Sequence, residues 1–382
     1  MALQQGINSL MTQGATDWAV LTVDLTNAFN SVKRSAVLQS AISTCPESVP
    51  WVSSMYGSHS SLYCQSRVLR SESGVQQGDP LGPLLFSWAL HPTANVVSSS
   101  VPWCSWYLDD GALIGTRPQL ESALAALVAD SPRTGLQVNL SKCQVWGPAP
   151  PTLSPLLSKV SPVPFTPGSG ITHLGSPVCH PASWDYASSV VLDRLARCQG
   201  VYRALENLPE AHIQYCLLRS TMDACRFNDL LRSIPLGIAD SAFTSASLAL
   251  RSAFETCLGS VVSPDQWAQV CLPIRMGGLG LRDPISIRAA ARVPTIVSYC
   301  CHALSAVPFL ESDPTPLPPP DTAGALAALS FGIGPHPILT TWSSDLSMLS
   351  TAVAPQTSQG WWTELFFRTQ KKYFTGVLHW PR

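Results

Sequence analysis

Three aspartates are the residues of this chain best suited to chemistry. Asp24 closes an apolar segment, WAVLTVDL (18–25), and Asp109 and Asp110 lie between two apolar, aromatic-rich runs in VPWCSWYLDDGALIGT (101–116). If the strands that carry them are neighbours in one sheet, three carboxylates converge, which is unfavourable unless a cation lies among them. Carboxylate oxygens suit Mg²⁺ or Mn²⁺, and two such ions can activate a hydroxyl and stabilise leaving oxygens in phosphoryl transfer.

Each of these acids also has a purely structural explanation. Asp24 can lie at a helix N-terminus, and Asp-Asp-Gly between apolar runs is a strong hairpin signal. Two further segments can likewise have either a functional or a purely structural explanation. In GVQQGDPLGPLLF (74–86), Gly78 permits a backbone close to a ligand, but the segment can equally be a turn before a buried helix. In GLQVNLSKC (135–143), Lys142 can reach a phosphate or simply be solvated.

The elements that must position these residues alternate along residues 17–148. Hydrophobic periodicity and the placement of prolines predict the following order: a strand at 18–25, a helix at 31–42 ended by Pro46 and Pro50, a strand at 62–70, a helix at 80–97 that Pro92 would kink or end, a hairpin at 101–116, a helix at 118–130, and a strand and turn at 135–146. This order, with its tight hairpins and intervening helices, predicts an α+β sheet covered by helices on one face.

The rest of the chain is of a different character. Residues 147–170 are rich in Pro, Gly and Ser and are expected to be a linker or exposed loop, and 185–258 are expected to be helical. Between Arg194 and Arg292 there are eleven arginines and no lysine, which fits either contact with a nucleic-acid backbone or an ordinary helix surface. ESDPTPLPPP (311–320) is expected to be a second, extended linker.

Composition excludes several classes of protein. The chain has 382 residues, of which 46% are hydrophobic and 12% charged, with 33 prolines and a net charge of −1, so it is globular but has no global positive field. It has no apolar run long enough to span a membrane, and its start lacks the basic flank of a signal peptide. Its twelve cysteines form no CxxC pair, which favours reduced thiols over structural zinc.

Joined in this order and spacing, the segments resemble the polymerase motifs of reverse transcriptases, specifically those of non-LTR retrotransposons. VDLTNAFNSV (23–32) is similar to the first aspartate motif, GVQQGDPLGPLLF to the template-grip motif, YLDDG (107–111) to the Tyr-x-Asp-Asp motif, and GLQVNLSKC to the following lysine motif. THLGSPV (172–178) resembles the primer-grip turn, and GGLGLRD (277–283) resembles a segment downstream of the thumb. The resemblance covers roughly residues 15–290.

The resemblance implies a role for each matching residue. Asp24, Asp109 and Asp110 would hold Mg²⁺ or Mn²⁺, and Lys142 would donate a proton to the leaving pyrophosphate. Phe29 would lie under the incoming sugar and exclude a 2′-hydroxyl. The template and nucleotide pocket would be lined by Gln77, Gly78, Asp79 and Pro80, and the primer end would be held by Leu174 and Gly175.

The resemblance also implies a domain plan and a set of partners. A right-hand polymerase palm with residual fingers would occupy residues 1–146, a Pro-rich connection with the primer-grip turn 147–184, a helical thumb 185–300, and an extension of unknown role 301–382. The resemblance implies that the sheet of this palm is antiparallel. The implied partners are an RNA template, a DNA primer and deoxynucleotides, with no membrane. A nuclear location is implied by the family alone, and the sequence leaves the oligomeric state open.

Two departures from the family keep other interpretations open. Only 23 residues precede Asp24, so a fragment without most of the basic fingers is expected, and residues 1–150 hold seven basic and nine acidic side chains. Cys300, Cys301 and His302 are adjacent, which is poor geometry for a metal site. The hypotheses are an active RNA-directed DNA polymerase, a catalytically inactive retroelement relic, and a module that binds RNA or protein.

Overall fold

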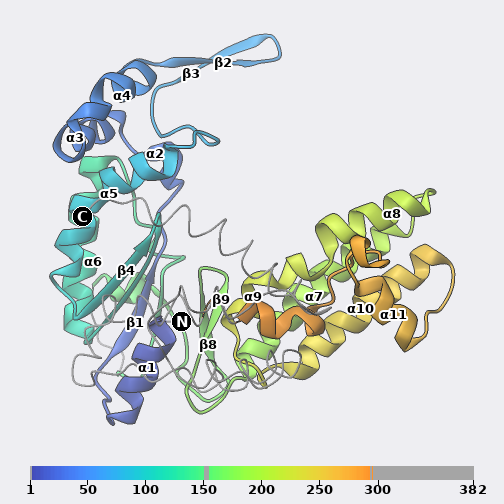
Figure 1. The fold of residues 1–382 in the computed structure, drawn as a ribbon. Coiled ribbons are helices and arrows are strands. Elements are labelled where there is room, and N and C mark those ends of the chain that lie inside the picture. The colour runs from blue at the N-terminus through green and yellow to red at the C-terminus, as the bar shows by residue number, and fades with distance from the viewer. Residues whose placement is uncertain (1, 150–154, 293–294, 296–382) are drawn as a thin grey trace, which may run out of the picture. The chain divides into compact units, whose positions relative to one another are not determined.

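The computed structural model describes residues 2–149, 155–292 and 295, and these fall into two compact units (Figure 1). The sheet unit comprises Asn8–Leu174, and the helical unit comprises Met1–Ile7 with Gly175–Arg382. The first helix, α1 (Ala2–Thr12), crosses the boundary between them in the sequence. The division between residues 174 and 175 falls inside the segment 147–184, which the sequence assigns to a connection. Three other predictions lie outside the described residues: the extension 301–382, the second linker at 311–320 and the group Cys300–His302.

A five-stranded sheet forms the centre of the sheet unit (Figure 1). Its strand order is β4-β5-β1-β6-β7, and only the β6–β7 pair is parallel. The strands are β1 (Ala19–Val23), β4 (Trp103–Tyr107), β5 (Asp110–Gly115), β6 (Gln144–Trp146) and β7 (Ser161–Pro162). The α+β class and the antiparallel sheet predicted from the sequence are therefore confirmed.

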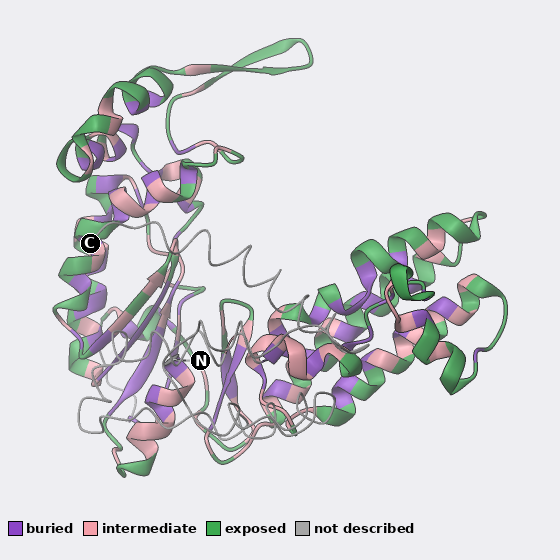
Figure 2. Ribbon diagram, in the orientation of Figure 1, coloured by how far each residue is buried: buried purple, intermediate pink, exposed green. Residues whose placement is uncertain are grey.

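One face of this sheet packs against two long helices. Leu21 on the central strand lies opposite Leu113 and Val145, and all three belong to the main hydrophobic core. The helices α5 (Gly82–Ser98) and α6 (Arg117–Thr134) pack on the strands from this side. Figure 2 shows the buried stripes of the two helices beside the buried strands.

The opposite face of the sheet is covered by a segment that was expected to be a linker. Val20, Ile114 and Trp146 point to this face and are almost fully buried. The ring of Phe165 lies 5.5 Å from that of Trp18 and 4.9 Å from that of Trp146, between ring centroids. Most of 155–170 is exposed or half-exposed, as expected for a loop, but Phe165 attaches this Pro-rich stretch to the sheet without any periodic pattern in the sequence.

The chain between β1 and α5 forms helices and a separate hairpin. It contains α2 (Ala28–Ser31), α3 (Arg34–Thr44), α4 (Val49–Tyr56), β2 (Ser60–Cys64) and β3 (Arg67–Ser71). Pro50 was expected to end the helical region but lies in the first turn of α4, where a missing N–H costs nothing. The single strand predicted at 62–70 is instead a hairpin that reverses at Gln65, whose φ is 53°.

Pro92 lies inside α5, which continues through it to Ser98. A proline within a helix costs about 3 kcal/mol. Burial of a row of side chains on this helix, including Leu85, Phe86 and Ala89, offsets that cost.

The helical unit has its own hydrophobic core. Its elements are β9 (Ser176–Cys179), α7 (Asp185–Leu205), α8 (Ala211–Leu217), α9 (Asn228–Ser233), α10 (Asp240–Leu258) and α11 (Pro264–Cys271), with a π-helical turn at Leu218–Met222 and further helix at 284–292. The prediction of a helical region at 185–258 is confirmed. All ten cysteines in the described residues are free thiols, and none of the helices in this part of the chain combines the length and the hydrophobicity that a membrane span needs.

Candidate active site

The three candidate aspartates lie at the same end of two adjacent strands. Val23, the last residue of β1, pairs with Gly111 of β5. Asp24 follows Val23 in the chain, and Asp110, the first residue of β5, precedes Gly111. Continuing the antiparallel register by one pair sets Asp24 opposite Asp110. Because side chains alternate along a strand, both belong to the sheet face that does not pack on α5 and α6. The expectation that these strands are neighbours is thus confirmed.

A two-residue turn between β4 and β5 carries Asp109. Tyr107 pairs with Asp110 across the hairpin, so Leu108 and Asp109 alone form the turn. Leu108 has a φ of 57°, a left-handed conformation that is unfavourable for a residue with a branched side chain. The hairpin predicted at Asp-Asp-Gly is present, and its strained position immediately precedes Asp109.

The electrostatics of this turn link all three carboxylates. The pKa of Asp110 is raised above its ordinary value, first by burial and then by the negative charges of Asp109 and Asp24. A repulsive field of this kind at a strand end is what a bound cation would neutralise.

The donor chemistry at this position fits a hard divalent cation. Carboxylate oxygens are the ligands that Mg²⁺ and Mn²⁺ prefer. Within 2–149, 155–292 and 295, however, no three Asp, Glu, His or Cys side chains are gathered closely enough to hold a metal ion. The backbone thus brings the three aspartates to one place, and metal binding by their side chains stays a prediction.

Removing the charge of Asp110 is expected to stabilise the fold while EDTA is present. The raised pKa means that ionisation of Asp110 disfavours the folded state, so this cost grows as the pH rises above the unfolded-state value of 3.8. Asp110→Asn should therefore melt at a higher temperature than the wild type at pH 7, and the difference should vanish below about pH 4. Thermal denaturation across this pH range measures it.

Magnesium supplies the control for that prediction. A cation that binds the carboxylates stabilises the wild type more than the variant, so adding Mg²⁺ should narrow the difference in melting temperature. A variant that melts below the wild type at pH 7 in EDTA would contradict the repulsion among the three carboxylates.

The lysine-bearing segment lies directly beside Asp24. The backbone N–H of Asn139 donates to the carbonyl of Asp24 at 2.9 Å, and that of Asp24 faces Cys143 Sγ at 3.4 Å. Leu25 and Val138 form an isolated antiparallel bridge between the two segments. The structure therefore brings the segment of Lys142 to the aspartates, while the Lys142 side chain itself is exposed and its role as a proton donor stays a prediction.

Phe29 is fixed by a second aromatic ring. It lies on α2 immediately after the Asp24 segment, and its ring stacks on Phe86 of α5 with centroids 4.6 Å apart and planes 12° from parallel. Phe86 is fully buried, whereas Phe29 is only partly covered. The contact with Phe86 fixes the position of the Phe29 ring, and no sequence pattern indicated this contact.

The loop that begins at Gly74 is attached to α2 by its backbone. Gly74 donates its N–H to the carbonyl of Val32, and Val75 donates to that of Phe29. A Cβ on Gly74 would lie only 2.6 Å from Asn30 Cα and from Phe29 O, and its φ is +75°, so this position requires glycine. Gly78 also has a positive φ, but open space surrounds it.

Tyr56 and Asp79 hold the rest of that loop in place. The Tyr56 hydroxyl donates a short hydrogen bond to Asp79 and accepts one from the backbone N–H of Gln76 at 3.2 Å. The other oxygen of Asp79 accepts from the backbone N–H of Leu81 at 2.9 Å. Burial and the bond to Asp79 raise the pKa of Tyr56. Asp79 thus supports the loop, while Gln77 and Gly78 form its exposed turn and Pro80 follows it.

Arg34 is a structural residue that the sequence patterns did not single out. Its side chain is buried and donates to the carbonyls of Ser58, Ser71 and Gly74 and to the Ser71 hydroxyl. It therefore joins the base of the β2–β3 hairpin to the start of the loop. Its only sequence signal was its place three residues into the predicted helix 31–42.

The expected primer-grip residues form a tight turn. Leu174 and Gly175 have φ angles of 51° and 75° and connect β8 (Gly170–His173) with β9. Both are exposed. A role in holding a primer stays a prediction.

Many arginines of the helical unit are engaged within that unit. Arg194 pairs with Asp229, Arg251 with Glu255 and Arg282 with Asp223. Arg288 and Arg292 are buried and donate to Asp240 and to backbone carbonyls. These five guanidinium groups therefore stabilise the helices, and fewer arginines remain for contact with a nucleic acid than the sequence suggested.

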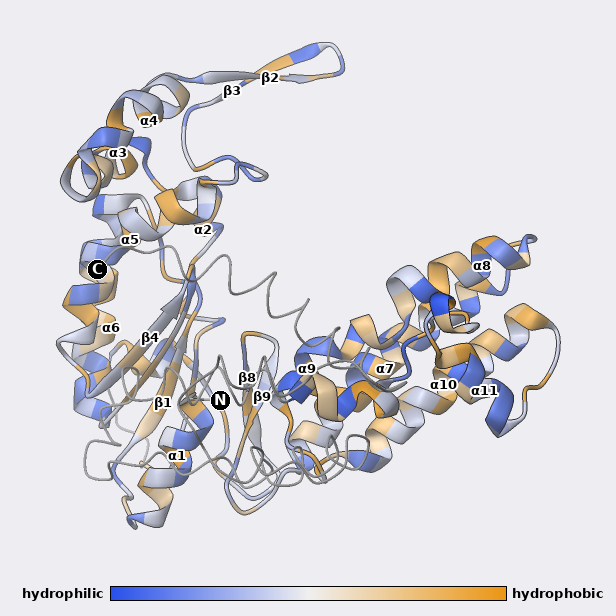
Figure 3. Ribbon diagram, in the orientation of Figure 1, coloured by the Kyte–Doolittle hydropathy of each residue, from blue (hydrophilic) through white to orange (hydrophobic). Residues whose placement is uncertain are grey.

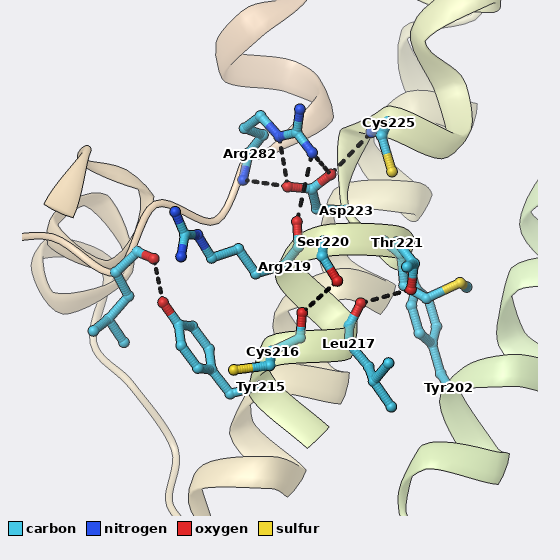
Figure 4. Close-up of polar contacts among 12 residues, drawn as sticks. Tyr202, Tyr215, Cys216, Leu217, Arg219, Ser220, Thr221, Asp223, Cys225 and Arg282 are labelled. Carbon is cyan, nitrogen blue, oxygen red and sulfur yellow. Dashed lines mark hydrogen bonds and ion pairs between the residues drawn. The ribbon is translucent and has the colours of Figure 1, made fainter. Parts of the chain in front are cut away.

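The GGLGLRD segment also has an internal role (Figure 4). The Asp223 carboxylate is fully buried and accepts from the Arg282 side chain at 2.7 and 2.8 Å and from the backbone N–H groups of Cys225 and Arg282. Asp283 accepts from Ser247 and Ser286. The segment thus ties the π-helical turn to α10 and to the helix that begins at 284.

A mainly antiparallel sheet with helices on one face and aspartates at the ends of two adjacent strands is consistent with a polymerase palm. Residues 2–167 match the family model of the reverse transcriptase (RNA-dependent DNA polymerase). Over this segment the chain is similar to reverse transcriptase domains.

Two further similarities were found. The chain is 27% identical over 152 residues to the retrotransposable element SLACS 132 kDa protein of Trypanosoma brucei gambiense, an alignment that covers 37% of this chain and 13% of the relative. A structure of telomerase from Candida albicans in complex with a fragment of telomeric RNA is a weak match, with a TM-score of 0.36 and 10% identity over 81% of this chain and 52% of the telomerase chain. The chain thus spans a small part of the curated relative.

Proposed function

We propose that this chain is an RNA-directed DNA polymerase that adds deoxynucleotides to the 3′-hydroxyl of a primer on an RNA template, as part of a retrotransposon. The observation that carries the proposal is the alignment of Asp24 with the Asp109–Asp110 turn, with the resulting rise in the pKa of Asp110. The match of residues 2–167 to the family supports it.

In this proposal each part of the site has its own task. Asp24, Asp109 and Asp110 would hold Mg²⁺ or Mn²⁺, whose chemistry is to activate a hydroxyl and to stabilise leaving oxygens. The loop 74–81, fixed by Gly74 and Tyr56, presents the exposed turn of Gln77 to the template and nucleotide. Catalysis by such a site consists of positioning and charge stabilisation.

Primer extension by the purified chain tests this function. An oligo(dT) primer annealed to a poly(A)-containing RNA gives the substrate, with Mg²⁺ and then Mn²⁺ as the metal. Extension that requires both the RNA template and the metal would support the proposal. A folded chain, checked by circular dichroism, that extends no primer with either metal would contradict it and favour a catalytically inactive relic.

Phe29→Val is expected to weaken the choice of deoxynucleotides over ribonucleotides. In the proposed site the ring of Phe29 fills the space that a 2′-hydroxyl would need, and Phe86 prevents the ring from moving back. We expect the ratio of kcat/KM for dNTP to that for rNTP to fall by about 10²-fold, the size of discrimination that steric exclusion of a small group provides. Single-nucleotide incorporation measures this ratio.

Phe165→Val is the matched control for the loss of an aromatic ring. Phe165 packs on Trp18 and Trp146 on the sheet face away from α5, so its loss should lower stability without changing the nucleotide preference. An unchanged preference in Phe29→Val would remove Phe29 from the nucleotide site.

A further inference from the structure

The β2–β3 hairpin exposes apolar side chains on both of its faces. It forms a two-stranded sheet of its own, and Figure 2 shows it exposed along its length. Tyr63 is 81% exposed, Val68 60%, Leu69 53% and Leu62 50%. Figure 3 shows apolar colouring within the hairpin. An isolated two-stranded hairpin is marginally stable, and exposed apolar side chains gathered in this way mark a binding surface.

The charge of the hairpin is entirely positive. Between Ser60 and Ser71 it carries Arg67 and Arg70 and no acidic residue. Both arginines are exposed. The other charged residues of the sheet unit are more often acidic than basic. Arg67 and Arg70 therefore form a local cationic surface, which complements a polyanion.

The pairing register puts the aromatic ring and one arginine on the same face. Tyr63 lies opposite Val68, and Arg70 lies opposite Ser61. Side chains diagonal to one another across such a pair are about 7–8 Å apart. A base stacked on Tyr63 would therefore have its backbone phosphate within the reach of the Arg70 side chain, the combination of aromatic platform and cation that single-stranded nucleic acids prefer.

Hydrogen bonds join the hairpin to the proposed template loop. Arg34 donates to the Ser71 carbonyl at 2.7 Å and to the Gly74 carbonyl at 3.2 Å, so one buried side chain joins β3 to the start of the loop. At the other strand, Gln76 Nε2 approaches Ser60 Oγ at 3.4 Å. A strand of RNA bound on the hairpin would thus lie on an element that is attached to the loop of Gln77.

We propose that the β2–β3 hairpin is a binding site for single-stranded RNA, with Tyr63 as the stacking platform and Arg70, on the same face, as the group that binds phosphate. The choice of RNA rests on the proposed function, in which this strand is the unpaired template. The binding depends on no metal and reads no base sequence, because stacking and phosphate contacts are sequence-tolerant.

Binding of a fluorescent single-stranded RNA to the full chain tests this inference. Fluorescence anisotropy is measured in EDTA at several salt concentrations. Tyr63→Leu keeps the apolar bulk but removes the ring, and should weaken binding about tenfold, whereas Tyr63→Phe should bind like the wild type. Arg70→Gln should reduce the slope of log K against log salt by about 0.7, the amount expected for one phosphate of a single strand that is no longer neutralised.

Two controls make the result specific to the hairpin. Arg197→Gln with Arg203→Gln removes two exposed arginines from α7 and should leave affinity for this RNA and the salt slope unchanged. A blunt RNA–DNA duplex has no unpaired strand, so the hairpin variants should bind it as the wild type does. All the hairpin substitutions are at exposed positions, so circular dichroism should show the wild-type fold.

The outcomes separate this inference from the proposed function. Hairpin variants with wild-type affinity and salt slope would overturn the inference, even if the chain extends primers. The inference would also be overturned if Tyr63→Leu changed only the oligomeric state in light scattering, which would make the hairpin a protein interface. Weakened RNA binding by a chain that extends no primer would support the hairpin site while the polymerase proposal fails.

Discussion

Asp109→Asn is expected to abolish primer extension, with a loss of at least about 10³-fold in kcat/KM. Electrostatic stabilisation by a bound divalent cation contributes several kcal/mol, and each 1.36 kcal/mol is about tenfold in rate. Asparagine has the same shape as aspartate but no charge, so the turn should keep its conformation while the cation loses a ligand. The measurement is single-nucleotide extension with Mg²⁺ and with Mn²⁺.

Asp17→Asn is the matched control for that variant. Asp17 is an exposed carboxylate that precedes β1, whereas Asp24 follows it, so the two acids flank opposite ends of one strand. This control should retain activity within about twofold, as expected for a surface substitution away from the site. If Asp109→Asn kept a tenth or more of the wild-type activity, the carboxylate would not belong to the chemistry.

The position of the three aspartates was predictable because strand patterns and hairpin signals are local. The apolar run before Asp24 and the paired runs around Asp-Asp-Gly each set a strand end within a residue or two. What the patterns could not supply is the pairing of β1 with β5, which joins residues far apart in sequence. From the sequence that pairing was only a condition, and the register of the two strands shows that it is met.

The parts that sequence patterns missed carry no recognisable local signal in the sequence. The segment 62–70 alternates like one strand, and its reversal at Gln65 has no glycine, asparagine or aspartate to signal it. Phe165 belongs to no periodic pattern, yet its ring packs on Trp18 and Trp146 at one face of the sheet. Arg34 was hidden because a buried arginine that bonds only to neutral oxygens is indistinguishable, in sequence, from an arginine on a helix surface.

Arg34→Met is expected to lower the stability of the sheet unit by an amount on the order of 3 kcal/mol. Methionine replaces the apolar stem but leaves the carbonyls of Ser58, Ser71 and Gly74 without their donor. Each hydrogen bond to a charged group contributes about 1.5–3 kcal/mol, and water can replace part of it at the exposed Ser58. The melting temperature of this unit should fall by about 6–12 °C.

Arg34→Lys separates the geometry of the guanidinium group from its charge. A lysine ammonium is a point charge that cannot span three carbonyls and a hydroxyl, so this variant should fall between the wild type and Arg34→Met. Arg133→Met is the matched control, since Arg133 forms an ion pair with Asp130 on α6 at 57% side-chain exposure and should change stability by no more than about 0.5 kcal/mol.

Limited trypsin digestion shows where the stability is lost. Arg67 and Arg70 are the exposed cleavage sites in the hairpin, and loss of the Arg34 bonds to Ser71 should free this hairpin first. Faster cleavage there in Arg34→Met, and not in Arg133→Met, is the expected result. Cleavage at an unchanged rate would mean that the hairpin is held by side chains other than Arg34. Because Gly74 shares the same guanidinium group, primer extension should decline together with the protection of the hairpin.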